Sequence, residues 1–378
     1  MGLGHIRESM WAAHAAHADW RAAADRCLAG VGTRDDAANL GFVYATDAFA
    51  PHFSDISAYL RDATGIAHWV GSVGLGICAS GIEYFDQPAL CLLTGRFPEQ
   101  AFRIIPTIVD DLQAFEAAHG AWCDASEAGF AMVHADPRNR NIALLVDTLC
   151  ERLHGGFVVG GLTSSRGAHP QLADAVTTGG VSGVVFDRQV TVVTRLTQGC
   201  SPLGPRHAIT RCRGNQLIEL DGRSALDVFY QDIGERLAGD PAHLGSLVFA
   251  GLPVKGSDTG DYLVRNLVGI DEERRVLAIA EGVEEGDAVM FCRRDSGAAA
   301  QDMRRMLSEI EAALEAPPRG GVYYSCLARG PNLLGANSEE LKLIESALGS
   351  FPLVGFFGNG EIAHNRLYGY TGVLTLFV

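Results

Sequence analysis

Residues 129–165 contain the stretch that decides the fold, GFAMVHADPRNRNIALLVDTLCERLHGGFVVGGLTSS. Its apolar run at 129–137 predicts a strand, and residues 141–153 predict a helix. A second apolar run at 156–165 predicts another strand, which ends in glycines and serines. Strands that alternate with helices are typical of α/β proteins, whose sheets are covered by helices.

The same order of elements occurs on both sides of this stretch. Residues 39–95 and 320–378 each predict a strand, a helix, a strand, a glycine-containing loop and a final strand. The middle strands share a Val-Gly step that we expect at their ends: Val70-Gly71, Val159-Gly160 and Val354-Gly355. Repetition of a whole supersecondary unit is a stronger indication than any single propensity. We therefore expect about three repeated strand-helix-strand-glycine loop-strand units with approximate internal symmetry.

A different stretch separates the second and third units. A helix at 224–237 precedes four strands between 245 and 295, and another helix follows near 297–315. An alanine-rich run at 8–29 predicts an N-terminal helix that ends at Gly30. We expect an N-terminal helical segment at 1–37 and two packed α/β domains with mixed sheets, at 38–220 and 221–378.

Composition restricts the classes of partner. The chain has 378 residues, of which 47% are hydrophobic and 20% charged, so it has enough apolar side chains for a folded core. Its formal net charge of −15 repels phosphate backbones and anionic lipid head groups. We expect neither nucleic acid nor a membrane as a partner.

Cysteine usage and apolar patterning indicate the compartment. Nine cysteines lie scattered, without C-x-x-C spacing, which favours reduced thiols in a cytosolic protein. We find no convincing targeting signal and no apolar run of about 18 residues, the length of a membrane span. We expect a cytoplasmic location.

Familiar catalytic and cofactor motifs are absent from the sequence. It contains no Walker A loop, no G-x-G-x-x-G, no H-E-x-x-H and no G-x-S-x-G. Common zinc sites and the usual hydrolase and nucleotide-binding classes are therefore not indicated, and we expect no metal. Haem held by a histidine alone stays open.

The first candidate ligand contacts are Cys326 and Arg329, where the first strand of the third unit ends. Strand ends of α/β sheets are common ligand sites, and arginine offers a planar fork for a carboxylate or phosphate. The alternative is a core cysteine beside a surface arginine.

The second candidate is the glycine loop with Gly355, Asn359, Gly360, Glu361 and His364. Glycines permit close backbone approach or positive φ, and the other three side chains are polar. The alternative is a glycine-rich turn with solvated side chains.

The third candidate is the loop with Gly160, Gly161, Ser164, Ser165 and Arg166. Glycine, hydroxyls and arginine together indicate an anion-binding nest, whereas the alternative is a loop capped by serine.

Histidines supply weaker candidates. His134 is a further candidate because it also lies at a predicted strand end. His14 and His17 lie one turn apart on the predicted N-terminal helix, a spacing that is more often incidental than metal-binding.

Three runs together resemble one known family. FVVGGLTSS at 157–165, VYYSCLARG at 322–330 and PLVGFFGNGEIAHNRLYGYTGVLTLF at 352–377 look like the FIST domain. The stretch from 261 to 295 is similar to the first part of its C-terminal half. The resemblance extends from about residue 38 to the end of the chain, with the two FIST portions meeting near 220.

The resemblance implies a sensory module of signal transduction that binds small ligands such as amino acids. Some bacterial relatives are haem-binding nitric oxide sensors that act on histidine kinases. The positions that match the family pattern are Cys326, Arg329, Gly355, Gly360, Glu361, Gly160 and Gly161.

We expect a bacterial, stand-alone small-ligand sensor whose output passes through a separate partner, such as a histidine kinase. One alternative is a haem-binding nitric oxide sensor. Another is an enzyme with Cys326 as nucleophile, His364 as base and Glu361 to orient the imidazole. The absence of the familiar catalytic motifs favours a protein that is not an enzyme.

Overall fold

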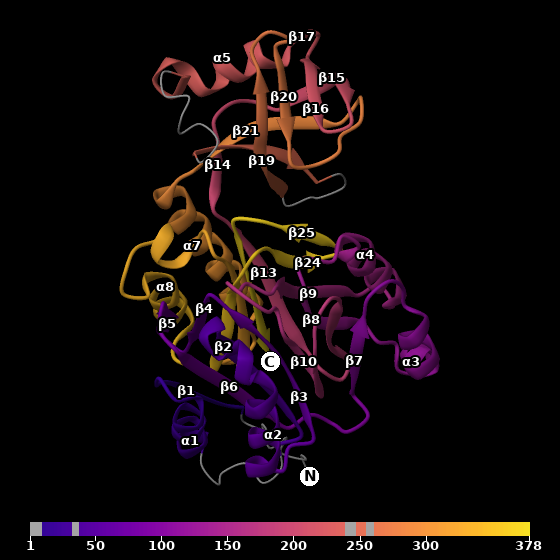
Figure 1. The fold of residues 1–378 in the computed structure, drawn as a ribbon, viewed down its shortest axis with the longest axis vertical. Coiled ribbons are helices and arrows are strands. Elements are labelled where there is room, and N and C mark those ends of the chain that lie inside the picture. The colour runs from indigo at the N-terminus through magenta and orange to yellow at the C-terminus, as the bar shows by residue number, and fades with distance from the viewer. Residues whose placement is uncertain (1–9, 32–37, 239–246, 255–260) are drawn as a thin grey trace. The chain divides into compact units, whose positions relative to one another are not determined.

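The protein is described by a computed structural model over residues 10–31, 38–238, 247–254 and 261–378 (Figure 1). It packs as two compact units. Unit 1 comprises Met1–Thr197, Met303–Leu367 and Thr371–Val378, and unit 2 comprises Gln198–Asp302 and Tyr368–Tyr370. The predicted class, a mixed α/β protein with helix-covered mixed sheets, is confirmed in outline.

Unit 1 is built around three pairs of parallel strands, each joined by a helix. The three strand–helix–strand segments are β2 (Leu40–Thr46), α2 (Phe53–Thr64) and β3 (His68–Gly74); β8 (Phe130–Ala135), α4 (Ile142–Arg152) and β9 (Phe157–Leu162); and β22 (Gly320–Cys326), α8 (Glu339–Leu348) and β23 (Leu353–Gly358). The predicted order of strand, helix and strand is thus present in each segment. A crossover helix is the usual connection between adjacent parallel strands.

Each parallel pair lies at the centre of a six-stranded mixed sheet. The strand orders are β1-β6-β2-β3-β10-β11, β7-β12-β8-β9-β24-β25 and β13-β26-β22-β23-β4-β5. The remaining strands are β1 (Trp11–Ala16), β4 (Gly76–Ala79), β5 (Ile82–Phe85), β6 (Ala89–Gly95), β7 (Phe102–Ile108), β10 (Gln171–Ala173), β11 (Ala175–Thr177), β12 (Val181–Phe186), β13 (Val192–Gln198), β24 (Glu361–His364), β25 (Arg366–Tyr368) and β26 (Thr371–Phe377).

The three sheets are interlocked by exchanged hairpins. The β4–β5 hairpin follows β3 in sequence but pairs with β23, and the β10–β11 hairpin follows β9 but pairs with β3. The β24–β25 hairpin follows β23 but pairs with β9, so its yellow strands lie beside the magenta β9 in Figure 1. Because the third sheet depends on strands from the first segment, the compact units do not divide at residue 220, which lies inside unit 2.

Helices cover the outer faces of the sheets, whereas the inner faces meet one another. On β2, Val43 and Ala45 face the cluster that contains residues of α1 (Trp20–Val31) and α2. The alternate residues of β2 point inward, where Phe42 lies 6.0 Å from Phe377 of β26 between ring centroids. This alternation follows from the two-residue period of a strand. Comparable outer clusters include residues of α3 (Gln113–Ser126) with α4, and of α7 (Ser296–Ala313) with α8.

The shared glycines mark the closest approach between paired strands. A Cβ atom on Gly71, Gly160 or Gly355 would lie 1.8, 2.0 or 1.8 Å from the carbonyl oxygen of the residue opposite, Val43, Val133 or Tyr323 respectively. Only glycine fits at such a distance. The prediction that these glycines end their strands is wrong, because each lies within its strand.

The predicted N-terminal helix at 8–29 is only partly correct. Residues 11–16 form β1, which pairs antiparallel with β6, and α1 begins only at Trp20. Ala13 and Ala15 alternate into the core, so sheet pairing overrides the helix preference of alanine. His14 therefore lies on a strand and not one helical turn from His17. The predicted helical residues at 8–9, and residues 32–37 of the N-terminal segment, lie outside the described residues.

Unit 2 contains a closed antiparallel barrel. Its path β21-β15-β16-β20-β19-β18 closes through pairing of β18 with β21. The elements are β14 (Cys200–Pro202), β15 (His207–Arg213), β16 (Gln216–Leu220), β17 (Arg223–Ser224), α5 (Ala225–Ala238), β18 (Val248–Pro253), β19 (Tyr262–Asp271), β20 (Val276–Ile279) and β21 (Ala288–Arg294). Leu226 and Phe229 of α5 pack into the barrel core. Within the described ranges, no helix combines the length and the apolar character needed to cross a membrane.

Candidate functional site

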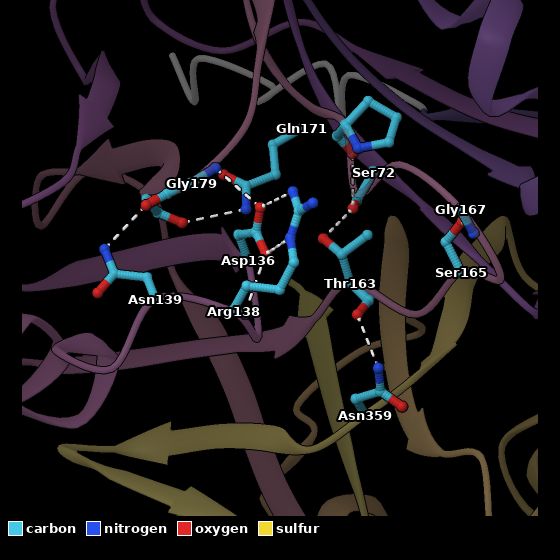
Figure 2. A network of polar contacts seen from close by, with 12 residues as sticks. Ser72, Asp136, Arg138, Asn139, Thr163, Ser165, Gly167, Gln171, Gly179 and Asn359 are labelled. Carbon is cyan, nitrogen blue, oxygen red and sulfur yellow. Dashed lines mark hydrogen bonds and ion pairs between the residues drawn. The ribbon is translucent and has the colours of Figure 1, made fainter.

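The carboxyl ends of β3, β9 and β23 meet in unit 1. The Ser164 hydroxyl donates to the Phe357 carbonyl at 2.5 Å and accepts from the Leu75 amide at 2.8 Å. The Asn359 side-chain amide donates to the Thr163 carbonyl at 3.2 Å, as Figure 2 shows. Three loops that are distant in sequence therefore form one junction at strand ends, the part of α/β sheets where ligands commonly bind.

A second polar group in Figure 2 is centred on the buried Asp136, directly after β8. Its carboxylate accepts from Arg138 Nη2 at 2.6 Å and from the Gly179 amide at 2.9 Å. Burial alone would raise the pKa of Asp136, but the hydrogen bonds from Arg138 and Gly179 hold this pKa below its usual value. Both carboxylate oxygens are used within the protein, so Asp136 acts as an anchor for these loops.

A pocket of about 160 Å³ opens beside the junction. We call it the strand-end pocket, and its lining residues are Thr46, Asp47, Ala48, Leu75, Asp86, Gln87, Pro88 and Arg166. Asp47 directly follows β2 and begins the 3-10 helix Asp47–His52, whereas Asp86 follows β5. Arg166 comes from the loop after β9, two residues beyond the junction serine Ser164.

Arg166 connects the two carboxylates of the pocket. Its Nη1 lies 3.1 Å from Asp47 Oδ1 and its Nη2 lies 2.6 Å from Asp86 Oδ1. Its backbone amide also donates to Asp47 Oδ2 at 3.0 Å. The side chain of Asp47 is only 9% exposed, whereas Arg166 is 62% exposed. The sequence predicted an anion nest, but the arginine here is shared by two aspartates, so the pocket carries both signs of charge.

The predicted glycine loops contact each other. Gly161 of β9 pairs with Glu361 of β24, and Gly160 pairs with Ile362. The Gly360 carbonyl accepts from the Leu162 amide at 2.8 Å. The second and third groups of candidate residues, which contain Glu361 and Gly161, therefore lie next to each other.

Cys326 and Arg329, the first predicted ligand contacts, do not both lie as expected. Arg329 is completely buried, and its Nε lies 2.8 Å from Oε1 of the equally buried Glu340. It therefore forms an interior ion pair and does not face a cleft. Cys326 ends β22 and is 8% exposed, and its backbone partner on β23 is Gly358.

The Glu361–His364 pair that was predicted to activate Cys326 does not form. The buried Glu361 accepts through Oε2 from the Thr371 hydroxyl at 2.7 Å, and burial raises its pKa to about 8. His364 is exposed and its ring lies 5.9 Å from that of Phe157. Glu361 and His364 lie three residues apart on β24, so their side chains point to opposite faces.

Ser165 has a local role. Its hydroxyl accepts from the Gly167 amide at 3.0 Å and so shapes the loop that carries Arg166 (Figure 2).

Sequence reasoning named His134 as a candidate but missed the tyrosines that join it in a buried polar group where the three sheets meet. Tyr44 Oη lies 3.1 Å from His134 Nε2 and 3.0 Å from Tyr324 Oη. The ring of Phe356 stacks on Tyr44 at 5.4 Å between centroids. All of these side chains are buried, and burial lowers the pKa of His134 to about 3. The imidazole is therefore neutral at physiological pH.

A comparison of the three predicted first strands could have found this group. Tyr44, His134 and Tyr324 each occupy the position after the residue that faces a shared glycine. The aligned tetrapeptides are FVYA, MVHA and VYYS.

Acid is expected to destabilise unit 1 through His134. The folded pKa of about 3 lies below the unfolded value of 6.5, so only the unfolded state gains a proton as pH falls below 6.5. This group should remove about 2 kcal/mol of unfolding free energy between pH 7.5 and pH 5. Urea unfolding followed by tryptophan fluorescence measures unit 1 alone, because Trp11, Trp20, Trp69 and Trp122 all lie there.

His134→Asn should lose this part of the pH dependence. His364→Asn, which alters an exposed histidine of the same unit, should retain it. Equal pH dependence in wild type and His134→Asn would contradict the prediction.

Comparison with known proteins gives the family. The chain matches the FIST N domain over residues 39–223 and the FIST C domain over residues 225–364. It is 32% identical over 343 residues to the uncharacterized protein Rv0628c of Mycobacterium tuberculosis, covering 86% of this chain and 87% of the relative. It is 29% identical over 363 residues to the uncharacterized protein Mb0898c of Mycobacterium bovis, covering 91% of each. The chain therefore belongs to the FIST family, whose domains occur in the sensors of signal transduction.

Proposed function

We propose that this chain is a small-ligand sensor whose ligand binds in the strand-end pocket. The observation that carries the proposal is the convergence of Asp47, Asp86 and Arg166 on one hollow at the strand ends. Charged groups fixed beside a hollow orient a polar ligand through charge-assisted hydrogen bonds. Family membership supports the sensory role.

The best-fitting ligand class is a small amino acid or a similar zwitterionic metabolite. Its ammonium group would contact the carboxylates of Asp47 and Asp86, and its carboxylate would contact the Arg166 guanidinium. A volume of about 160 Å³ is below the range of about 300–1,000 Å³ that is typical for larger drug-sized ligands. Size therefore favours the smallest members of this class.

Thermal unfolding and calorimetry with a panel of amino acids, amines and carboxylic acids test the proposal. A ligand at about 100 times its dissociation constant should stabilise the protein by about 2.7 kcal/mol. Arg166→Ala should weaken ligand binding about tenfold or more, because one charge-assisted contact with the ligand is lost. Arg188→Ala is the matched control, because Arg188 is similarly exposed and pairs with Glu127 away from the pocket.

Arg188→Ala should keep near wild-type stability without ligand, because an exposed ion pair contributes only about 0–1 kcal/mol. Arg166→Ala should still fold, because the 9% exposed Asp47 keeps its hydrogen bond from the backbone amide of residue 166. If no compound of the panel stabilises the protein, small-ligand sensing in this form is refuted. If a ligand binds Arg166→Ala and wild type equally, the strand-end pocket is not its site.

We further propose that the sensor is cytoplasmic and acts through a separate signalling protein, such as a histidine kinase. The net charge of −15 supports a protein partner over nucleic acid or an anionic membrane surface. Co-purification from a bacterial host with and without ligand would identify such a partner.

The strand-end pocket does not fit haem. Its lining contains no histidine, and its volume suits a much smaller molecule. His134 is engaged with Tyr44 through Nε2. We therefore assign no step of the sensing function to haem.

We also propose that the three strand–helix–strand segments of unit 1 are copies of one repeated unit. The common strand order of the three sheets and the equivalent places of Gly71, Gly160 and Gly355 support this origin.

A further inference from the structure

A histidine in unit 2 lies between two carboxylates. His207 Nδ1 is 2.6 Å from Asp221 Oδ2, and His207 Nε2 is 2.8 Å from Asp232 Oδ2. His207 and Asp232 have side-chain exposures of 7% and 6%, whereas Asp221 is 46% exposed. This cluster belongs to the barrel and is separate from the strand-end pocket.

The geometry requires a positively charged imidazole. An ionised carboxylate only accepts hydrogen bonds, so both ring nitrogens must donate, and only the imidazolium form carries two N–H donors. Loss of the proton would leave one carboxylate facing a bare nitrogen lone pair, with its hydrogen bond broken.

The three residues join three parts of unit 2. His207 begins β15, Asp221 lies in the turn between β16 and β17, and Asp232 lies on α5. A Cβ atom on Gly204 would lie 2.5 Å from the Asp232 carboxyl group, so the loop before β15 also packs closely over it. The contact is near the end of the regular part of α5, because Gly234 has a non-helical φ of 73°.

We propose that Asp221, His207 and Asp232 form a pH-dependent latch that holds the end of α5 to the barrel while His207 is protonated. The apolar side chains of Leu226 and Phe229 keep the first turns of α5 in the core, and Ile233 belongs to the same cluster. The latch therefore adds to apolar packing at the turn of α5 that carries Asp232. It is a device of unit 2 and does not depend on the ligand pocket.

The charges around the latch favour its closed state. Burial alone would lower the pKa of His207, but its hydrogen bonds to Asp221 and Asp232 and their charges raise it above 6.5. The pKa of Asp221 is lowered by the hydrogen bond from His207, the Ala208 amide and the nearby Arg223. Among the side chains that the structure describes, these aspartates and Arg223 are the charged groups that act on the cluster.

The directions of the His207 and Asp221 pKa shifts define the pH range in which the latch is closed. The stabilisation from His207 is fully present below its unfolded pKa of 6.5 and is lost as pH rises through its higher folded value. The stabilisation from Asp221 is fully present above its unfolded pKa of 3.8 and is lost as pH falls through its lower folded value. The latch is therefore fully closed between about pH 4 and pH 6.5 and opens in alkali.

Amide hydrogen exchange and NMR of the full chain test the latch. Protection of the α5 amides near Asp232, corrected for intrinsic exchange, should fall about tenfold as pH rises above the pKa of His207. A tenfold change is expected because one charge-assisted hydrogen bond is lost. His207→Gln, which has no titrating ring, should show low protection that does not vary with pH. His68→Gln is the control, because His68 also lies 2.8 Å from a carboxylate, that of Asp174, but in unit 1.

Nitrogen chemical shifts of the imidazole give an independent readout. They should report two protonated nitrogens at pH 6 and a titration above 6.5. Should His207→Gln fail to fold, Asp221→Asn keeps the ring but removes one of the two carboxylates that raise the pKa of His207, so the loss of α5 protection should move to lower pH. A His207 that titrates at or below 6.5, or wild-type α5 protection that is constant from pH 6 to pH 9, overturns the proposal.

Discussion

Replacement of Glu340 by glutamine is expected to destabilise unit 1 by about 3–5 kcal/mol, the typical cost of breaking a buried ion pair. Glu340 Oε1 accepts from Arg329 Nε at 2.8 Å and from the Tyr323 hydroxyl at 2.5 Å, and Oε2 accepts from the Gly330 amide at 2.7 Å. Glutamine would remove the hydrogen-bonded counter-charge of the buried guanidinium. It would also turn an NH₂ group toward groups that donate.

Glu361→Gln is the matched comparison, because Glu361 is equally buried but has no ion pair among its hydrogen bonds. Its pKa of about 8 means that the folded state holds a proton at pH 7 that the unfolded state, with a pKa of 4.5, has released. Stability from this group is therefore lost as pH rises from 4.5 to 8, at a cost of up to about 3 kcal/mol at pH 7. Glutamine resembles the protonated acid without that cost, so Glu361→Gln should stabilise unit 1.

Urea unfolding at pH 7, followed by tryptophan fluorescence, measures both changes in unit 1. The two substitutions are chemically identical, yet we expect opposite signs. A Glu340→Gln protein as stable as wild type would show that the ion pair contributes little. A destabilised Glu361→Gln protein would show that Glu361 is ionised in the folded state.

The interior position of Arg329 illustrates where sequence reasoning failed. An arginine after a strand normally faces solvent, and the local pattern of residues 322–330 is compatible with that position. Its burial depends on Glu340, which lies on the following helix and contacts Arg329 only once β22 and α8 have packed. A pairing of this kind leaves no periodic pattern in the sequence.

Local patterns did predict the three strand–helix–strand segments and their helices, because apolar spacing is set by the elements themselves. The exchange of hairpins was not predictable in this way. The register of β24 against β9, with Glu361 opposite Gly161, joins positions about 200 residues apart. The same limit applies to the strand-end pocket: Arg166 was a candidate, whereas Asp47 and Asp86 became its partners only through the tertiary fold. For β1, pairing with β6 outweighed the helix propensity of its alanines.

Substitution of Gly355 by alanine is expected to destabilise unit 1 severely. The added Cβ would lie 1.8 Å from the Tyr323 carbonyl oxygen and 3.0 Å from the Tyr323 amide nitrogen, both backbone atoms of the paired strand. Neither can move without breaking the β22–β23 ladder, whose register places Gly355 opposite Tyr323. We expect a loss of about 4 kcal/mol or more, in the range of the most severe single substitutions, or a failure to fold.

Gly167→Ala is the control, because Gly167 also lies in unit 1 but has no atom within 4 Å of the position that a Cβ would occupy. Its unfolding free energy should change by less than about 1 kcal/mol. Gly71→Ala and Gly160→Ala should be as damaging as Gly355→Ala, since their added Cβ atoms would lie 1.8 and 2.0 Å from carbonyl oxygens of β2 and β8. Soluble yield and urea unfolding by tryptophan fluorescence compare the four proteins. Equivalent losses at the three glycines would support one repeated unit, because the same backbone contact would then be indispensable in each copy. A Gly355→Ala protein as stable as Gly167→Ala would refute the close approach of the paired strands.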